Sequence, residues 1–188
     1  MQNSFRIIAG TWRSRKLTFP GTVETLRPTK DRVRETLFNW LQQKIIGTSC
    51  LDLFAGSGAL SFEALSRQAG KVTAIDNSPE ATRMMTENCK LLDCNNMEVI
   101  TADAMLWLEQ YAGQFQFDII FLDPPFGENL LEACCALLDS GNYLATGALV
   151  YLESAFSLEE INLPSHWSLL KHKKAGQVHY GVCEHIIL

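Results

Sequence analysis

The sequence has 188 residues, a length typical of a single domain and too short for a multidomain machine. Apolar residues make up 47% and charged residues 20%, which excludes disordered and fibrous proteins. The amino-terminal segment is polar and contains Arg6, unlike a signal peptide, and no apolar stretch reaches the ~18 residues of a membrane span. We therefore expect a cytoplasmic protein that makes no membrane contact, and we expect a monomer.

The six cysteines form no CxxC pair, and the four histidines lack the spacing of a metal site. In a reducing compartment these cysteines are expected to be free, small and buried. No metal is expected.

The charge is unevenly distributed along the chain. The net charge of −5 by itself argues against a nucleic-acid partner, because phosphate binding depends on Lys and Arg. Residues 1–47, however, contain nine basic and three acidic side chains, a net charge of +6, and the remaining residues carry −11. This division predicts a basic extension over residues 1–47 and an acidic catalytic domain over residues 48–188. The alternative is a solvated hairpin and helix that are rich in arginine.

In chain order, residues 5–19 are predicted to form a hairpin with Gly10 and Thr11 at its bend. A helix is expected from Thr29, which is a good N-cap, and its apolar stripe comprises Val33, Leu37, Trp40 and Leu41.

From residue 49, strands alternate with helices, the pattern of a mostly parallel sheet covered on both faces. The expected strands are 50–54, 71–75, 97–101, 117–122, 149–152, 168–174 and 178–187, and the helices are 60–67, 79–92, 104–111 and 130–138. The last two strands form a hairpin at Ala175 and Gly176. A doubly wound sheet of seven strands, the last one antiparallel, resembles the Rossmann-like fold of class I methyltransferases.

The turn after the first strand of this sheet, Asp52–Gly58, predicts a cofactor site. Gly56 and Gly58 let the backbone approach a ligand at a helix N-terminus, and Asp76 after the next strand can accept hydrogen bonds from ribose hydroxyls. Ser61 replaces the third glycine of a dinucleotide motif, and Asp52 would repel a pyrophosphate. These features favour S-adenosylmethionine, which has no phosphate and carries a cationic amine and sulfonium.

After the third strand, Asp103 is a candidate acceptor for the adenine amino group, or alternatively caps the helix that begins at Ala104. The expected cofactor-binding residues are Asp52, Phe54, Ala55, Gly56, Gly58, Asp76, Asn77, Asp103 and Ala104.

A buried strand runs directly into Asp123-Pro124-Pro125-Phe126, a turn made rigid by two prolines. The amine of a nucleobase is a poor nucleophile because its lone pair is delocalised into the ring. Asp123 and the Pro124 carbonyl could accept its two N–H hydrogens and direct the lone pair at a methyl donor, while Phe126 stacks on the base. These four residues are the catalytic candidates, although such a turn can also be only a stiff loop.

Together, Asp52–Gly58, Asp76 and Asp123–Phe126 resemble the amino-methyltransferases of the class I superfamily, which act on adenine N6 or guanine N2. Residues 6–17 and 26–41, with their Arg-Pro-Thr-x-x-Arg-Val-Arg-Glu run, are similar to the bacterial 16S ribosomal RNA guanine-N2 methyltransferases that act at guanine 966. The resemblance covers nearly the whole chain, with Ala9 and Ser14 as departures where glycine is common.

The resemblance implies that the substrate is 16S RNA within the small ribosomal subunit, with ribosomal proteins as further partners. It places Arg27, Thr29, Arg32 and Arg34 near the active-site mouth, and Arg6, Arg13, Arg15 and Lys16 along the RNA backbone. Lys171–Lys174 could extend this RNA-binding face or be an exposed strand end.

Three other functions remain open: an adenine-N6 methyltransferase acting on DNA or RNA, a catalytically silent RNA-binding assembly factor, and a nucleotide-dependent oxidoreductase. The DNA methyltransferase is disfavoured because the chain has no room for a separate DNA-reading domain. The silent assembly factor is disfavoured because the glycines and Asp123–Phe126 are intact, and the oxidoreductase is disfavoured by Ser61.

Overall fold

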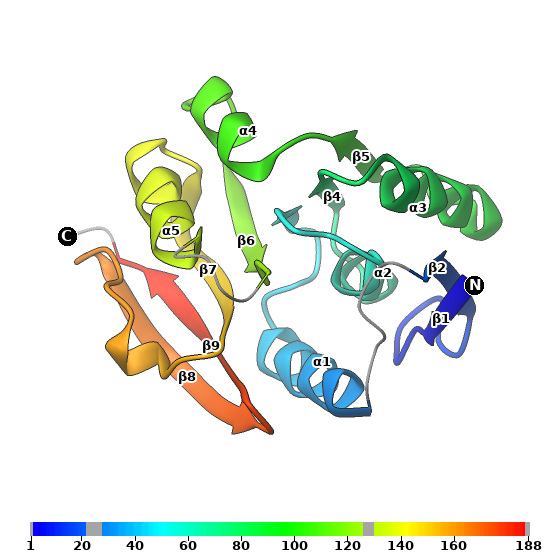
Figure 1. The fold of residues 1–188 in the computed structure, drawn as a ribbon, viewed down its shortest axis with the longest axis horizontal. Helices are drawn as coiled ribbons and strands as arrows, with labels where there is room; N and C mark the ends of the chain where they lie inside the picture. Colours follow the sequence, from blue (N-terminus) through cyan, green and yellow to red (C-terminus); the bar gives the residue numbers. More distant parts are fainter. Residues whose placement is uncertain (1, 22–27, 126–129, 187–188) are drawn as a thin grey trace.

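The computed structural model describes residues 2–21, 28–125 and 130–186 (Figure 1). Strands β1 (Gln2–Arg6) and β2 (Lys16–Pro20) form an antiparallel hairpin, and helix α1 (Pro28–Leu41) follows. The hairpin is confirmed, but the segment that connects its strands spans residues 7–15 and is longer than a bend at Gly10 and Thr11.

The expected N-cap at the start of α1 is wrong. Pro28 already belongs to the helix, so Thr29 lies inside its first turn. Proline is tolerated there because the first turn of a helix needs no N–H donor. The apolar stripe is confirmed for Val33, Leu37 and Leu41, which are buried, and it also includes Phe38.

Among the described residues, seven strands form one sheet in the order β5-β4-β3-β6-β7-β9-β8. Of these seven strands only β9 runs opposite to the other six, which confirms the predicted doubly wound fold with its last strand reversed. The strands are β3 (Ser49–Asp52), β4 (Lys71–Asp76), β5 (Met97–Thr101), β6 (Phe117–Leu122), β7 (Leu144–Ser154), β8 (Trp167–Ala175) and β9 (Val178–His185).

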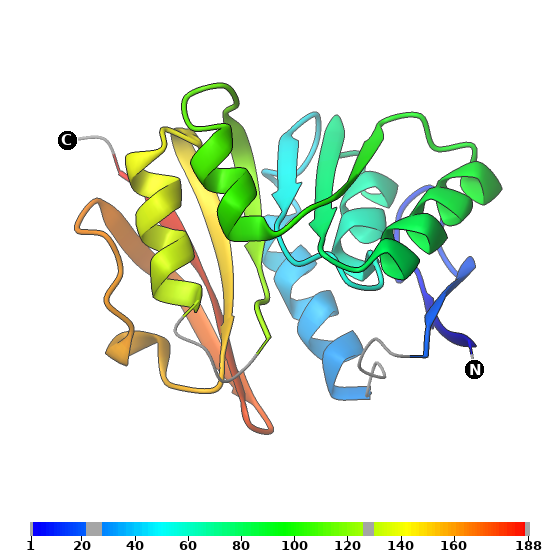
Figure 2. The ribbon, with the colours of Figure 1, turned by 45° about the horizontal axis from the view of Figure 1, so that its top comes forward.

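Helices cover both faces of this sheet, as Figures 1 and 2 show. Side chains alternate between the faces of a strand. Phe121 therefore packs in the apolar cluster with α1, α2 (Ala59–Ser66), α3 (Pro79–Leu92) and the hairpin. Its neighbour Leu122 packs in the second cluster, with α4 (Ala104–Gln110) and α5 (Leu130–Ser140). Side chains of the hairpin and α1 thus share a core with the sheet.

The parallel strands all end at one edge of the sheet, which we call the carboxyl edge. The turn between β8 and β9 lies at this same edge, because Ser154 at the end of β7 pairs with His179, and His179 pairs with Lys174 (Figure 2). Helices α2 and α3 run in the opposite direction, so their last turns lie at the other edge. In the described part of the chain, no helix has the length and apolar character needed to cross a membrane.

Candidate active site

The ends of the parallel strands surround a cavity of about 590 Å³ at the carboxyl edge. Parallel α/β sheets place their ligand sites there, because every strand presents its following turn at that edge. The lining includes eight of the nine predicted cofactor-binding residues, namely Asp52, Phe54, Ala55, Gly56, Asp76, Asn77, Asp103 and Ala104, together with Asp123 and Pro125 from the predicted catalytic turn.

Gly58, the ninth predicted residue, is not in the cavity lining but shapes the turn. Its φ of 75° is in the left-handed region, and a Cβ there would lie 2.9 Å from Cε2 of Phe62 and 3.0 Å from Sδ of Met85. Both the backbone conformation and the packing therefore require glycine at the start of α2.

Asp76 connects the glycine turn to the next strand. Its Oδ2 accepts a hydrogen bond of 2.7 Å from the backbone N–H of Gly56, and its Oδ1 accepts one of 2.9 Å from Ser78. A carboxylate has about four acceptor sites, so these bonds hold the group in place and leave capacity for the hydroxyls of a ligand.

Asp103 is the N-cap of α4. Its Oδ1 accepts hydrogen bonds from the backbone N–H groups of Met105 at 2.9 Å and Leu106 at 3.0 Å. The capping alternative is therefore confirmed. Because Asp103 also lies in the cavity lining, the cap holds its carboxylate at the ligand site.

Asp52 is buried and accepts a hydrogen bond of 2.6 Å from the hydroxyl of Ser61, the residue in the place of the third glycine. Burial raises the pKa of Asp52 to about 7, the Ser61 hydrogen bond opposes this shift, and the charges of Asp123 and Asp76 add to it. A cationic ligand would favour the ionised form of this carboxyl, whereas a pyrophosphate would not. The acidic lining thus fits the chemistry of S-adenosylmethionine.

At the end of β6, the chain enters the Asp-Pro-Pro turn from a strand whose residues 119–122 are buried. Asp123 is half-buried, Pro124 is buried, and Pro125 is exposed. Asp123 and Pro125 face the same cavity as Gly56 and Asp76. Phe126 lies outside the described residues.

Glu153, near the end of β7, is a cavity residue that sequence reasoning missed. Leu152 pairs with Leu122, so Glu153 and Asp123 each follow one member of a strand pair. The buried hydroxyl of Tyr151 donates a 2.6 Å hydrogen bond to Glu153, and burial raises the pKa of Tyr151 well above its usual value. The sequence did contain a signal for Glu153, because Asp52, Asp76 and Asp123 were predicted as site residues from the same feature, an acidic residue near the end of a buried strand.

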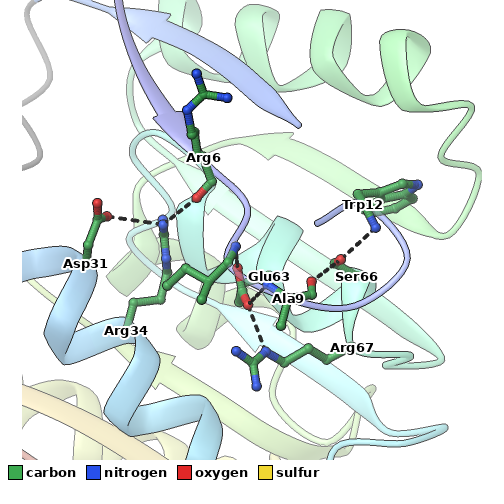
Figure 3. Close-up of polar contacts among 9 residues, drawn as sticks. Arg6, Ala9, Trp12, Asp31, Arg34, Glu63, Ser66 and Arg67 are labelled. Carbon is green, nitrogen blue, oxygen red and sulfur yellow. Dashed lines mark hydrogen bonds and ion pairs between the residues drawn. The ribbon is translucent and has the colours of Figure 1, made fainter. Parts of the chain in front are cut away.

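The hairpin is held on α2 by a buried carboxylate, as Figure 3 shows. Glu63 accepts hydrogen bonds from the backbone N–H groups of Ile8 at 2.8 Å and Ala9 at 3.1 Å, and pairs with Arg67 at 2.7 Å. The hydroxyl of Ser66 accepts a hydrogen bond from the backbone N–H of Trp12 and donates one to the backbone carbonyl of Ala9. The segment from residue 7 to 15 is therefore tied along the helix.

The predicted RNA-binding residues are not gathered at one place. Arg6, Arg13, Arg15, Lys16 and Arg32 are exposed. Arg15 donates a long hydrogen bond of 3.3 Å to the Leu91 carbonyl, in the last turn of α3. The segment that carries Arg13 and Arg15 thus lies toward the edge of the sheet opposite the cavity. Arg27 and the side chain of Thr29 are outside what the structure describes.

Arg34 differs from these residues because its side chain is only 4% exposed. Its Nη2 donates to the Arg6 carbonyl at 2.6 Å and to Asp31 at 3.1 Å (Figure 3). The guanidinium also lies over the Phe5 ring, 5.3 Å from its centre. Arg34 also lines the cavity. Arg34 therefore lies at the cavity, but its side chain is buried rather than open to RNA phosphate.

A basic surface is found instead at the tip of the β8–β9 hairpin. Lys171, Lys173 and Lys174 are exposed there, and Nζ of Lys173 lies 5.9 Å from the ring centre of Trp40 on α1. Trp40 is half-buried and stacks on Tyr180. Of the other tryptophans, Trp107 and Trp167 are core residues.

Comparison with known proteins assigns the chain to a family. The family model described as "Conserved hypothetical protein 95" matches residues 5–184. The chain is 48% identical over 177 residues to the Ribosomal RNA small subunit methyltransferase D of Haemophilus influenzae, covering 93% of this chain and 91% of that protein. It is 46% identical to the protein of the same name from Escherichia coli, covering 93% and 87%.

A solved Escherichia coli structure, described as a proposed methyltransferase named yhhF, superimposes with a TM-score of 0.90 at 44% identity, covering 99% of this chain and all of that one. The match extends from the basic hairpin to the last strand. The chain therefore belongs to the family of the ribosomal RNA small subunit methyltransferases D, whose family model is described as conserved hypothetical protein 95.

Proposed function

We propose that this protein transfers a methyl group from S-adenosylmethionine to the exocyclic N2 amine of a guanine in 16S ribosomal RNA of the small subunit, at guanine 966. The main observation in support is that Asp123 lines the same cavity as the glycine turn and Asp76. The group that would hold the amine and the groups that would hold the cofactor are thereby side by side.

The cofactor is supported by the balance of charge in the cavity. Five carboxylates, those of Asp52, Asp76, Asp103, Asp123 and Glu153, line it, and a diphosphate would be repelled. S-adenosylmethionine carries two positive groups and one carboxylate, and when bound it supplies a methyl group on a cationic sulfur. Asp76 would accept the ribose hydroxyls, and Asp103 the adenine amino group.

At the other end of the cavity, Asp123 and the Pro124 carbonyl would accept the two N–H hydrogens of the target amine. These contacts would direct the nitrogen lone pair toward the methyl group that the bound cofactor supplies, and Asp123, already hydrogen-bonded to the amine, would accept the proton that the amine loses. Such positioning can supply about 7–11 kcal/mol of the barrier reduction. Phe126 would stack on the guanine.

For the RNA partner, we propose that residues 1–47 act as a basic extension of the methyltransferase domain 48–188. Arg6, Arg13, Arg15, Lys16 and Arg32 are exposed and can contact phosphate. The three lysines near the β8–β9 turn lie at the carboxyl edge of the sheet, the edge at which the cavity is found. The alternative for these lysines is that they prevent the edge strand β8 from pairing with another sheet.

A single labelling assay tests the proposal. Labelled S-adenosylmethionine is offered separately to small subunits lacking the modification, to naked 16S RNA and to DNA, and the labelled nucleoside is identified by mass spectrometry. We expect N2-methylguanine at guanine 966, with Asp123→Ala and Asp123→Asn lowering kcat about 100-fold or more. Asp118→Asn, an exposed residue on the same strand, is the matched control.

The other functions considered for this protein predict other outcomes of the labelling assay. Labelled methyl-adenine would show that the protein is an adenine-N6 methyltransferase. RNA binding with no label in any substrate would indicate an assembly factor, and labelling that does not depend on Asp123 would contradict the proposed role of the turn.

A further inference from the structure

Arg34 is the one cation among the described residues that line the cavity, which is otherwise acidic. It reaches this place from α1, one turn after Asp31. Burial lowers the pKa of Arg34 and the charges of Glu63 and Asp31 oppose this shift, but an arginine side chain is not deprotonated in proteins. The positive charge of Arg34 is therefore a permanent feature of the cavity wall.

Two of the three guanidinium nitrogens of Arg34 have no hydrogen-bond partner among the residues that the structure describes. Within the described residues, Nη2 is hydrogen-bonded to Arg6 and Asp31, whereas Nε and Nη1 are buried and make no hydrogen bond. Buried donors are nearly always satisfied, and each unsatisfied one is unfavourable, more so when the group is charged. Anchoring the hairpin thus explains only part of this side chain.

An anion or another strong acceptor that enters the cavity would satisfy these donors, because Arg34 belongs to the cavity lining. In S-adenosylmethionine, the sulfonium and the amine suit the five carboxylates, but the methionyl carboxylate would be repelled by them. Arg34 is the single described lining residue that can neutralise this carboxylate. Arginine is also better suited than lysine to bind carboxylates, because its planar group presents several fixed donors.

We propose that Arg34 binds the carboxylate of the methionyl group of S-adenosylmethionine through the guanidinium N–H groups that the protein leaves unpaired. This inference rests on the proposed function for the identity of the cofactor. It changes the role of Arg34 from an RNA contact to a cofactor contact. It also means that one side chain joins the cofactor to the hairpin, through the Arg6 carbonyl and the Phe5 ring.

The test is a double-mutant cycle in which one partner is the ligand. Isothermal titration calorimetry measures the affinity of the wild type and of Arg34→Met for S-adenosylmethionine and for its decarboxylated form, which lacks only the carboxylate. We expect the wild type to prefer the intact cofactor by about 10- to 100-fold, and Arg34→Met to lose this preference. Arg34→Lys should retain part of it.

Arg67→Met is the matched control. Arg67 is also a shielded arginine that pairs with a carboxylate and lies over an aromatic ring, but it is not in the cavity lining. It should lower the melting temperature while leaving the preference for the carboxylate unchanged. Equal weakening of both ligands in Arg34→Met would instead show that Arg34 acts only on the structure of the site.

The comparison of the two ligands on the wild-type protein needs no variant, so it tests the inference even if Arg34→Met does not fold. A wild type that binds both ligands equally overturns the inference and leaves the proposed function intact. A wild type that binds neither ligand overturns both. Normal cofactor binding without RNA methylation overturns only the proposed function.

Discussion

Ser61 donates a 2.6 Å hydrogen bond to Oδ2 of Asp52, and both residues are buried. Ser61 stands where a dinucleotide-binding motif has its third glycine, and its hydroxyl holds the carboxyl group of Asp52, which lines the cavity. An acidic group at this position fits the cationic ligand proposed above better than a pyrophosphate.

Asp52→Asn should change how stability depends on pH. Burial raises the pKa of Asp52 from 3.8 to about 7, so the folded protein retains a proton that the unfolded chain loses between pH 4 and 7. The wild type therefore loses stability as pH rises through this range, by an amount on the order of 4 kcal/mol from this group. Asparagine cannot ionise and avoids this loss.

Urea unfolding at pH 5 and pH 8 measures this effect. Relative to the wild type, Asp52→Asn should be more stable at pH 8 than at pH 5, and it should bind S-adenosylmethionine more weakly, by about tenfold at pH 8. The same stability difference at both pH values would show that Asp52 does not titrate in this range.

Glu63→Gln should destabilise the protein by about 2–4 kcal/mol, because the buried carboxylate holds the hairpin by two backbone N–H groups and pairs with Arg67. The control is Glu87→Gln on the surface of α3, whose ion pair with Arg83 is exposed and should contribute less than about 1 kcal/mol. Chemical denaturation compares the two variants, and equal effects would contradict the anchoring role of Glu63.

Gly10→Ala should be strongly destabilising, by about 3 kcal/mol or more. Gly10 has a φ of 84°, and a Cβ there would lie 1.8 Å from the carbonyl oxygen of Ser66. Gly176→Ala in the β8–β9 turn shares a positive φ of 63° but meets no atom within 4 Å, so about 1 kcal/mol is expected. Thermal unfolding of both variants separates the close approach from the backbone strain.

RNA binding should depend on salt through both basic surfaces. Arg13→Ala/Arg15→Ala and Lys173→Gln/Lys174→Gln should each reduce the slope of log K against log salt by about 2. Loss of the lysine pair, which lies at the same edge of the sheet as the cavity, should also raise KM for methylation more than loss of the arginine pair. Filter binding at several salt concentrations measures the slope, with Lys90→Gln on α3 as a control, and an unchanged slope removes that pair from the phosphate contacts.

Local sequence was sufficient for most elements of the fold. Glycine, proline and apolar periodicity identified α3, β5 and β6 at their observed bounds, because these signals come from residues close together in the chain. The predicted start of α1 was wrong, because Thr29 and Pro28 both suit the start of a helix and the structure places the proline inside the helix.

The sequence by itself determined that acidic residues follow the buried strands and that a glycine turn and an Asp-Pro-Pro turn occur among them. Parallel strands then bring such turns to one edge. Only the tertiary structure decided the environment of each side chain: that Asp52 is desolvated enough to raise its pKa, that Glu153 joins the cavity, and that Arg34 is buried while its neighbour Arg32 is exposed. The burial and charge environment of Arg34 depends on residues distant in the chain, such as Glu63 and the hairpin around Arg6. The local sequence around Arg34 therefore does not predict this environment.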